Sequence, residues 1–131
     1  MPILWDTLKQ VAINPQILIY KPSIIYRTSV IQTIYNEYLK QGEDKICDII
    51  SKRFGSENFT VIENAFPYDV GNGILHYLIF VKPSTTLSTE FINRLVTGLK
   101  VGFNKTESLC FEMPSLKRSL PCLQHFHIFL K

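Results

Sequence analysis

The sequence predicts an α+β fold in which N-terminal helices precede an antiparallel sheet with a packed helix. Two observations indicate this fold. Through most of residues 1–55, apolar side chains recur every three to four positions, whereas residues 56–131 contain short β-branched and aromatic runs and one further helical stretch. A length of 131 residues is typical of one domain, so we expect a single domain made of these two parts.

The helical part contains three segments with clear periodicity. Apolar residues at helical spacing begin at Trp5, and this first helix breaks near Asn14 and Pro15. Residues 17–25 are apolar but interrupted by proline, and their conformation stays open. From residue 23 the apolar pairs predict an amphipathic helix that ends before Gly42, and a further helix with apolar residues at 46, 49–50 and 54 stops at Gly55.

The second part contains four predicted strands and one predicted helix. The strands are expected at residues 59–62, 74–81, 106–113 and 124–130, and the helix begins after the N-cap Ser88. Residues 64–73 form a turn-rich loop, and residues 114–121 form a basic connection.

Composition excludes several classes of protein. Hydrophobic residues make up 46% and charged residues 19%, which excludes a disordered or collagen-like chain. A net charge of +3 permits an anionic ligand, but the dispersed basic residues predict no nucleic-acid partner. No apolar run approaches the length of a membrane span, and no signal peptide is evident. The three cysteines, Cys47, Cys110 and Cys122, form no CxxC pair, so we expect reduced thiols in a cytoplasmic or nuclear protein that is not secreted.

All three histidines fall in predicted strands. Alternation along a strand places His125 and His127 on one face, while Phe126, Ile128 and Leu130 lie on the other face and should meet the core. His76 shares its face with two apolar neighbours in the strand at 74–81. If these two strands are neighbours in the sheet, the three imidazoles can converge.

Two chemistries suit such a cluster. One imidazole can attack phosphorus while a second orients it or handles a proton, which assigns His125 as nucleophile and His127 as its partner. Alternatively, His76, His125 and His127 can hold a zinc ion that keeps one position open for water. Each histidine can also be a buried strand residue with a satisfied hydrogen bond.

Further candidate binding residues lie in the two loops and at the start of the strand at 74–81. Asn64 is a candidate contact to a ribose hydroxyl, and we place Tyr68 and His76 with it on the substrate-binding side of the site. Arg118 and Ser119 stand shortly before the last strand and offer a guanidinium and a hydroxyl to phosphate oxygens.

Several motifs in order along the chain resemble the N-acetylglucosamine-induced protein family, a domain of unknown function found in fungi, plants and large DNA viruses. They are Trp5-Asp6-x-Leu8, Asn64-Ala65-Phe66-Pro67-Tyr68, Gly73-Ile74-x-His76, Ser115-Leu116-Lys117-x-Ser119-x-Pro121 and His125-Phe126-His127-Ile128. This chain has Ala65 and Phe66 where that family commonly has Asp and Trp. The resemblance names no activity.

The order of the loop at 64–68, the strand with His76, a helix and the His125-Phe126-His127 strand is also similar to histidine-triad (HIT-like) proteins. That resemblance implies nucleotide binding on an α+β sheet and attack on the α-phosphate by the middle histidine of His-x-His-x-His. It assigns the nucleophile to His125 and leaves Leu123 at the first position of the triad, or Phe129 at the third in the alternative register.

Three functions therefore stay open. The first is a protein that binds a small phosphorylated ligand, such as a nucleotide or nucleotide sugar, as a hydrolase or transferase acting through His125. The second is a three-histidine metal protein with zinc as its cofactor. The third is a non-enzymatic binding or regulatory module. The sequence leaves open whether the protein is an enzyme and which oligomeric state it adopts.

Overall fold

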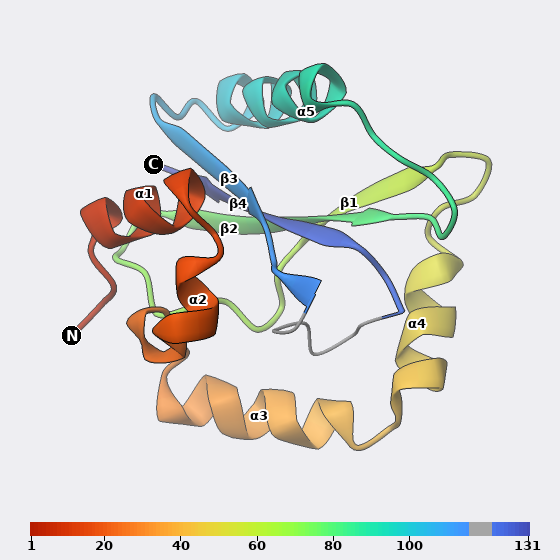
Figure 1. Ribbon diagram of the computed structural model, residues 1–131, viewed down its shortest axis with the longest axis horizontal. Coiled ribbons are helices and arrows are strands. Elements are labelled where there is room, and N and C mark those ends of the chain that lie inside the picture. The colour runs from red at the N-terminus through yellow and green to blue at the C-terminus, as the bar shows by residue number, and fades with distance from the viewer. Residues whose placement is uncertain (116–121) are drawn as a thin grey trace.

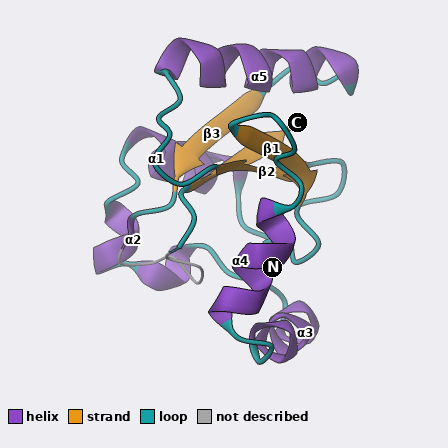
Figure 2. Cartoon of the chain, turned by 90° about the vertical axis from the view of Figure 1, so that its right-hand side faces the viewer, coloured by secondary structure: helices purple, strands orange, loops and turns teal. Residues whose placement is uncertain are grey.

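The computed structural model describes residues 1–115 and 122–131 and has an α+β fold. The N-terminal helices precede an antiparallel sheet, and a long helix packs on one face of that sheet, as the sequence predicts. Figures 1 and 2 show three layers, with α5 on one side of the sheet and the N-terminal helices on the other. Within residues 1–115 and 122–131, no helix is both long enough and apolar enough to cross a bilayer.

The N-terminal part consists of short helices joined by tight turns: α1 (Trp5–Ile13), α2 (Ile17–Tyr20), the 3-10 helix η1 (Pro22–Ile24), α3 (Ser29–Leu39) and α4 (Glu43–Ser51). The prediction that the second long helix starts near residue 23 is wrong. Thr28 ends the preceding loop as an N-cap, because its hydroxyl accepts a hydrogen bond from the backbone of Ile31. Gly42 separates α3 from α4 with φ of 96°, a conformation that glycine adopts without steric cost.

The sheet contains β1 (Phe59–Glu63), β2 (Leu75–Val81), β3 (Ser108–Glu112) and β4 (His125–Leu130). Its strand order is β1-β2-β4-β3, and every neighbouring pair is antiparallel. The four strands lie within two residues of their predicted positions. The two histidine-bearing strands, β2 and β4, are neighbours at the centre of the sheet.

Helix α5 (Thr89–Gly102) covers one face of the sheet (Figure 1). The Ser88 hydroxyl caps its first turn, as the sequence predicts. Beneath this helix Ile128 and Leu130 are fully buried, which confirms that their face of β4 meets the core.

The opposite face of the sheet meets the N-terminal helices through two separate apolar clusters. One joins α1 and α2 to Phe129 and Phe111, and the other joins α4 to Leu78 and Phe80. Both faces of the central strands are therefore covered, and this second face carries the three histidines. They keep only 4% (His76), 8% (His125) and 3% (His127) of their surface exposed.

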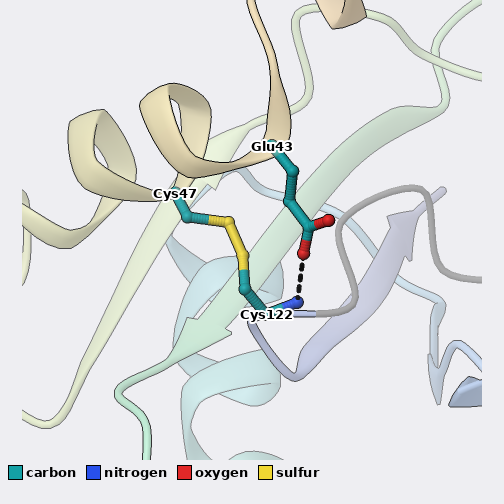
Figure 3. Close-up of side chains that lie close together, drawn as sticks. All are labelled: Glu43, Cys47 and Cys122. Carbon is teal, nitrogen blue, oxygen red and sulfur yellow. Dashed lines mark hydrogen bonds between the residues drawn. A yellow bond between two sulfur atoms is a disulfide. The ribbon is translucent and has the colours of Figure 1, made fainter.

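The prediction of three reduced thiols is wrong for two of the cysteines. A disulfide joins Cys47 on α4 to Cys122 just before β4 (Figure 3). An odd number of cysteines excludes only complete pairing, and the fold brings together two residues that are 75 positions apart. Cys110 on β3 is the free thiol, and burial raises its pKa to about 12.

Candidate functional site

A cavity of about 920 Å³ lies between the sheet and the N-terminal helices. It borders on both apolar clusters of that face, because the helices meet the sheet at two places and leave space between them. Its polar and aromatic lining includes Arg27, Tyr35, Tyr38, Arg53, Asn64, Phe66, Tyr68, His125 and His127. A volume of this size falls in the range of small-molecule sites.

The register of β2 against β4 brings the histidines together. His127 lies opposite Leu78, and His76 lies opposite Phe129, one step along the same face. The ring nitrogens His76 Nε2 and His127 Nδ1 are 2.8 Å apart and share a hydrogen bond. The His125 ring lies 5.3 Å from the His127 ring, measured between centroids. The three imidazoles therefore converge.

A backbone amide sets the protonation pattern of His76 and His127. The Tyr68 N–H can only donate, and it points at His76 Nδ1 at 3.3 Å, so this nitrogen is an acceptor. Neutral His76 then carries its proton on Nε2 and donates to His127 Nδ1. Neutral His127 must therefore carry its own proton on Nε2.

That last N–H is the unusual feature of the site. His127 Nε2 is buried and has no hydrogen-bond partner among the residues that the structure describes. Most buried polar atoms in proteins are hydrogen-bonded, and leaving one unpaired costs about 1–3 kcal/mol. His127 lines the cavity, and the buried Nε2–H of its ring has a fixed orientation and no acceptor among the described residues.

Burial keeps the two hydrogen-bonded histidines neutral. It lowers the pKa of His76 to about 3, and the positive charge of Arg27 acts in the same direction. Burial likewise holds the pKa of His127 well below its usual range, helped by the neighbouring imidazoles and by Arg27. Since both rings are neutral near pH 7, the proton positions derived above apply there.

His125 has the opposite proton arrangement. Its Nδ1 lies 3.3 Å from the carbonyl oxygen of Leu123, which can only accept, so neutral His125 carries its proton on Nδ1. The lone pair is then on Nε2. A nucleophilic imidazole requires this tautomer, in which one nitrogen is held by a carbonyl and the other carries the lone pair.

Asn64 is buried and already occupied. Its side-chain oxygen accepts from the Phe66 N–H at 2.9 Å, and its side-chain nitrogen lies 3.4 Å from each ring nitrogen of His76. It therefore shapes the loop and supports His76, and its role as a ribose contact stays a prediction. His76 is not among the residues that line the large cavity and borders a smaller one of about 290 Å³.

Tyr68 supports the site through its ring as well as its backbone. The ring stacks on His127 at 5.2 Å between centroids, and burial raises the pKa of its hydroxyl to about 12. Tyr68 lines the cavity, and its role in substrate binding stays a prediction.

Arg27 is a site residue that sequence reasoning missed. Its guanidinium lies between two aromatic rings, 4.1 Å from the centroid of Tyr35 and 4.8 Å from that of Tyr68. Its Nε donates to the Phe66 carbonyl at 2.8 Å. Ion pairs between described residues do not include Arg27, so this half-buried cation has no acidic partner among them. An isolated arginine before a helix carries no sequence signal for this role.

One wall of the cavity is aromatic and was also missed. Tyr35 and Tyr38, one turn apart on α3, pack on Phe66 with centroid distances of 5.1 and 4.9 Å. Their spacing in the sequence predicts only the apolar stripe of an amphipathic helix.

Two predicted phosphate-binding residues, Arg118 and Ser119, lie outside the described residues. The alternative assignment of His76, His125 and His127 as ligands of one metal ion stays a prediction. Their ring nitrogens do not all lie within 4.8 Å of one another, a condition that among the described residues Glu43, Cys47 and Cys122 meet. In addition, the hydrogen bond between His76 and His127 occupies one nitrogen of each ring.

No protein-family model and no curated protein sequence matches the chain. Among solved structures, the fold is similar to that in the crystal structure of a protein called HTC1, with a TM-score of 0.63 and 16% identity. The match covers 96% of this chain and 83% of the other. At this identity the likeness shows a shared fold.

Proposed function

We propose that the chain binds a small phosphorylated ligand of the nucleotide or nucleotide-sugar class in the cavity between the sheet and α3. The observation that carries the proposal is the buried Nε2–H of His127, which lacks a partner among the described residues. A phosphate oxygen at this position removes the cost of the unpaired donor. Because the ring is neutral, the contact is a directed hydrogen bond and persists across physiological pH.

Arg27 supports the choice of an anion. Its guanidinium lines the same cavity, and its Nε is taken by the Phe66 carbonyl, so a phosphate contact falls to its terminal nitrogens. Guanidinium groups bind phosphate oxygens through paired, charge-assisted hydrogen bonds. The Arg27 guanidinium stacks on the rings of Tyr35 and Tyr68. These contacts restrict the Arg27 side chain before a ligand binds, which lowers the entropy lost on binding.

The aromatic wall of the cavity offers a place for the base of a nucleotide. Tyr35, Tyr38 and Phe66 offer ring faces to a planar base, and such stacking tolerates different bases. The loop at 64–68 and the strand at 125–128, which carry the resemblance to N-acetylglucosamine-induced and histidine-triad proteins, both contribute to the cavity. We therefore keep kinship with these families as part of the proposal.

The reaction we propose starts at His125. Its Nε2 lone pair forms a bond to phosphorus, and the bond from phosphorus to the leaving oxygen breaks with its electron pair. His127 Nε2–H donates to a phosphoryl oxygen, and water then hydrolyses the phosphohistidine. The triad positions at Leu123 and Phe129 hold no proton donor, so the site suits phosphoanhydrides, whose leaving group is already an anion.

Calorimetry of the purified chain tests the binding step. The ligands are AMP, a nucleoside diphosphate sugar, a dinucleoside polyphosphate and inorganic phosphate. We expect His127→Phe, which keeps the ring volume, and Arg27→Met each to weaken binding by about tenfold or more. Arg94→Met is the matched control, because Arg94 also lies over an aromatic ring but on α5, away from the cavity. No heat from any ligand at millimolar concentration removes the proposal.

A separate measurement tests the reaction. Intact-protein mass spectrometry after acid-free quenching should detect a phosphoryl or nucleotidyl adduct that is lost in His125→Ala. Binding without adduct or product favours the non-enzymatic module, for which the neutral, fully engaged His76 and the incomplete triad are the supporting observations.

A further inference from the structure

Three metal-ligating side chains gather where α4 meets the start of β4 (Figure 3). Glu43 and Cys47 are four residues apart and so lie on one face of α4, and Cys122 reaches them from the other segment. A carboxylate oxygen and the two sulfur atoms all lie within 4.8 Å of one another. In this structure the two sulfurs are joined as a disulfide.

We propose that the reduced form of this cluster, Cys47, Cys122 and Glu43, is a binding site for one zinc ion. Two thiolates and one carboxylate are a zinc ligand set, and a tetrahedral ion keeps its fourth position for water or another donor. The proposal is independent of the ligand cavity and of the histidines.

Reduction of the disulfide between Cys47 and Cys122 precedes zinc binding. Two thiol groups of a reductant supply two electrons, the S–S bond of the protein breaks, each sulfur takes a proton, and the reductant leaves as its own disulfide. Zinc then displaces both protons and binds two thiolates and one oxygen of Glu43. With Zn–S bonds of about 2.3 Å, the two sulfurs lie about 3.8 Å apart across the ion.

The surroundings of the cluster suit a metal ion. The Cys122 N–H donates to Glu43 Oε1 at 3.2 Å, which orients the carboxylate and leaves Oε2 for the ion. Glu43 and Cys122 are exposed, so an ion can enter, while Cys47 packs against the apolar cluster under α4 and is held in place. Cys110 lies on β3 beside Ile128, on the face that α5 covers, and does not compete for the site.

The position of the cluster gives zinc a structural consequence. Cys122 is three residues before His125, and the carbonyl of the intervening Leu123 holds the His125 ring. A disulfide in oxidising conditions and a zinc ion in reducing conditions both tie α4 to this end of β4. The cavity wall therefore stays connected in either state.

Cobalt is the first probe, because it reports thiolate ligation and tetrahedral geometry in its absorption spectrum. The full chain is reduced with a water-soluble phosphine, which takes an oxygen from water and does not compete as a thiol would. We expect one cobalt per chain, with a thiolate charge-transfer band and visible tetrahedral bands, and displacement of cobalt by equimolar zinc. The oxidised chain should bind neither ion at this site.

Variants separate the three ligands. Cys47→Ser and Cys122→Ser should abolish the spectrum, Cys110→Ser should leave it unchanged, and Glu43→Gln should weaken binding on the order of tenfold or more. Glu43→Gln keeps a side-chain oxygen for the Cys122 N–H, so it tests ligation without removing that hydrogen bond. Should a cysteine variant fail to fold, the comparison of oxidised with reduced wild-type chain needs no substitution.

Three outcomes overturn the proposal. They are equal metal binding by oxidised and reduced chains, binding that survives both cysteine substitutions, and binding that Glu43→Gln leaves unchanged.

Discussion

The buried pair of histidines should make the protein less stable as the pH falls, and replacing His76 by Phe should remove part of that loss. The pKa of His76 is lowered to about 3 in the folded chain, against an ordinary value of 6.5. At pH values between these two pKa values, His76 is protonated in the unfolded chain and neutral in the folded chain. Stability therefore falls as the pH drops below 6.5, and the loss is complete below pH 3.

The size of this effect follows from the same two values. At one pKa unit per 1.36 kcal/mol, the full penalty for His76 is about 5 kcal/mol. Between pH 7.5 and pH 5 the part that develops is about 2 kcal/mol. This is a large share of the 5–15 kcal/mol that is typical of folded domains. His127 acts in the same direction, because its pKa is lowered as well.

Urea unfolding at pH 7.5, 6 and 5 measures the effect in the wild-type chain and in His76→Phe. Phenylalanine keeps an aromatic ring beside Phe129, and every other ionisable group is present in both proteins, so the difference between their losses reports on position 76 and its contact with His127. The variant starts lower at pH 7.5, because the Tyr68 N–H and His127 Nδ1 lose their partner. Between pH 7.5 and 5 it should lose about 2 kcal/mol less than the wild type. Equal losses in the two proteins refute the assignment of His76 as a neutral, buried imidazole.

Three further predictions concern the cysteines and one helix cap. Without a reductant, a thiol reagent at pH 8 should label no cysteine in the folded chain, because burial raises the pKa of Cys110 and the other two cysteines are joined. In urea the reagent should label one cysteine, Cys110. Labelling of two or three cysteines in urea contradicts the disulfide. Cys47→Ser should lower the free energy of unfolding by up to about 4 kcal/mol, because the bond to Cys122 closes a loop across 75 positions, and denaturant titration against Cys110→Ser checks this. Ser88→Ala should cost about 1 kcal/mol in thermal or urea unfolding, since its hydroxyl caps α5, while Thr97→Ala on the exposed side of that helix should change little.

The strands and most helices could be predicted from the sequence, because each depends on a local pattern and the tertiary contacts favour the same structure. Alternation placed Ile128 and Leu130 on one face of the last strand, and α5 buries that face. Ser88 was recognisable as a cap because the hydrogen bond it makes is local. The start of α3 was misplaced because apolar periodicity extends into the preceding turns, where the cap at Thr28 decides the boundary.

Only the part of the candidate site that lies on one strand could be predicted from the sequence. Same-face placement of His125 and His127 follows from strand geometry, but the contact of His76 with His127 required β2 and β4 to be neighbours. Arg27 and Tyr35 reach the cavity from the helical part, and no spacing in the sequence links them to the strands. The disulfide was missed for the same reason, because its two cysteines meet only when α4 packs beside the start of β4.

From the chain alone, the order of helices and strands, the apolar face beneath α5 and the pairing of two histidines on one strand face were determined, because each depends on residues close together in sequence. Strand order, the space left between the two apolar clusters and the proton positions on the imidazoles were decided by the tertiary structure. The physical reason is that a tautomer depends on which donor or acceptor faces each nitrogen. For His76 and His127 those partners, the Tyr68 amide and the other imidazole, come from different segments of the fold.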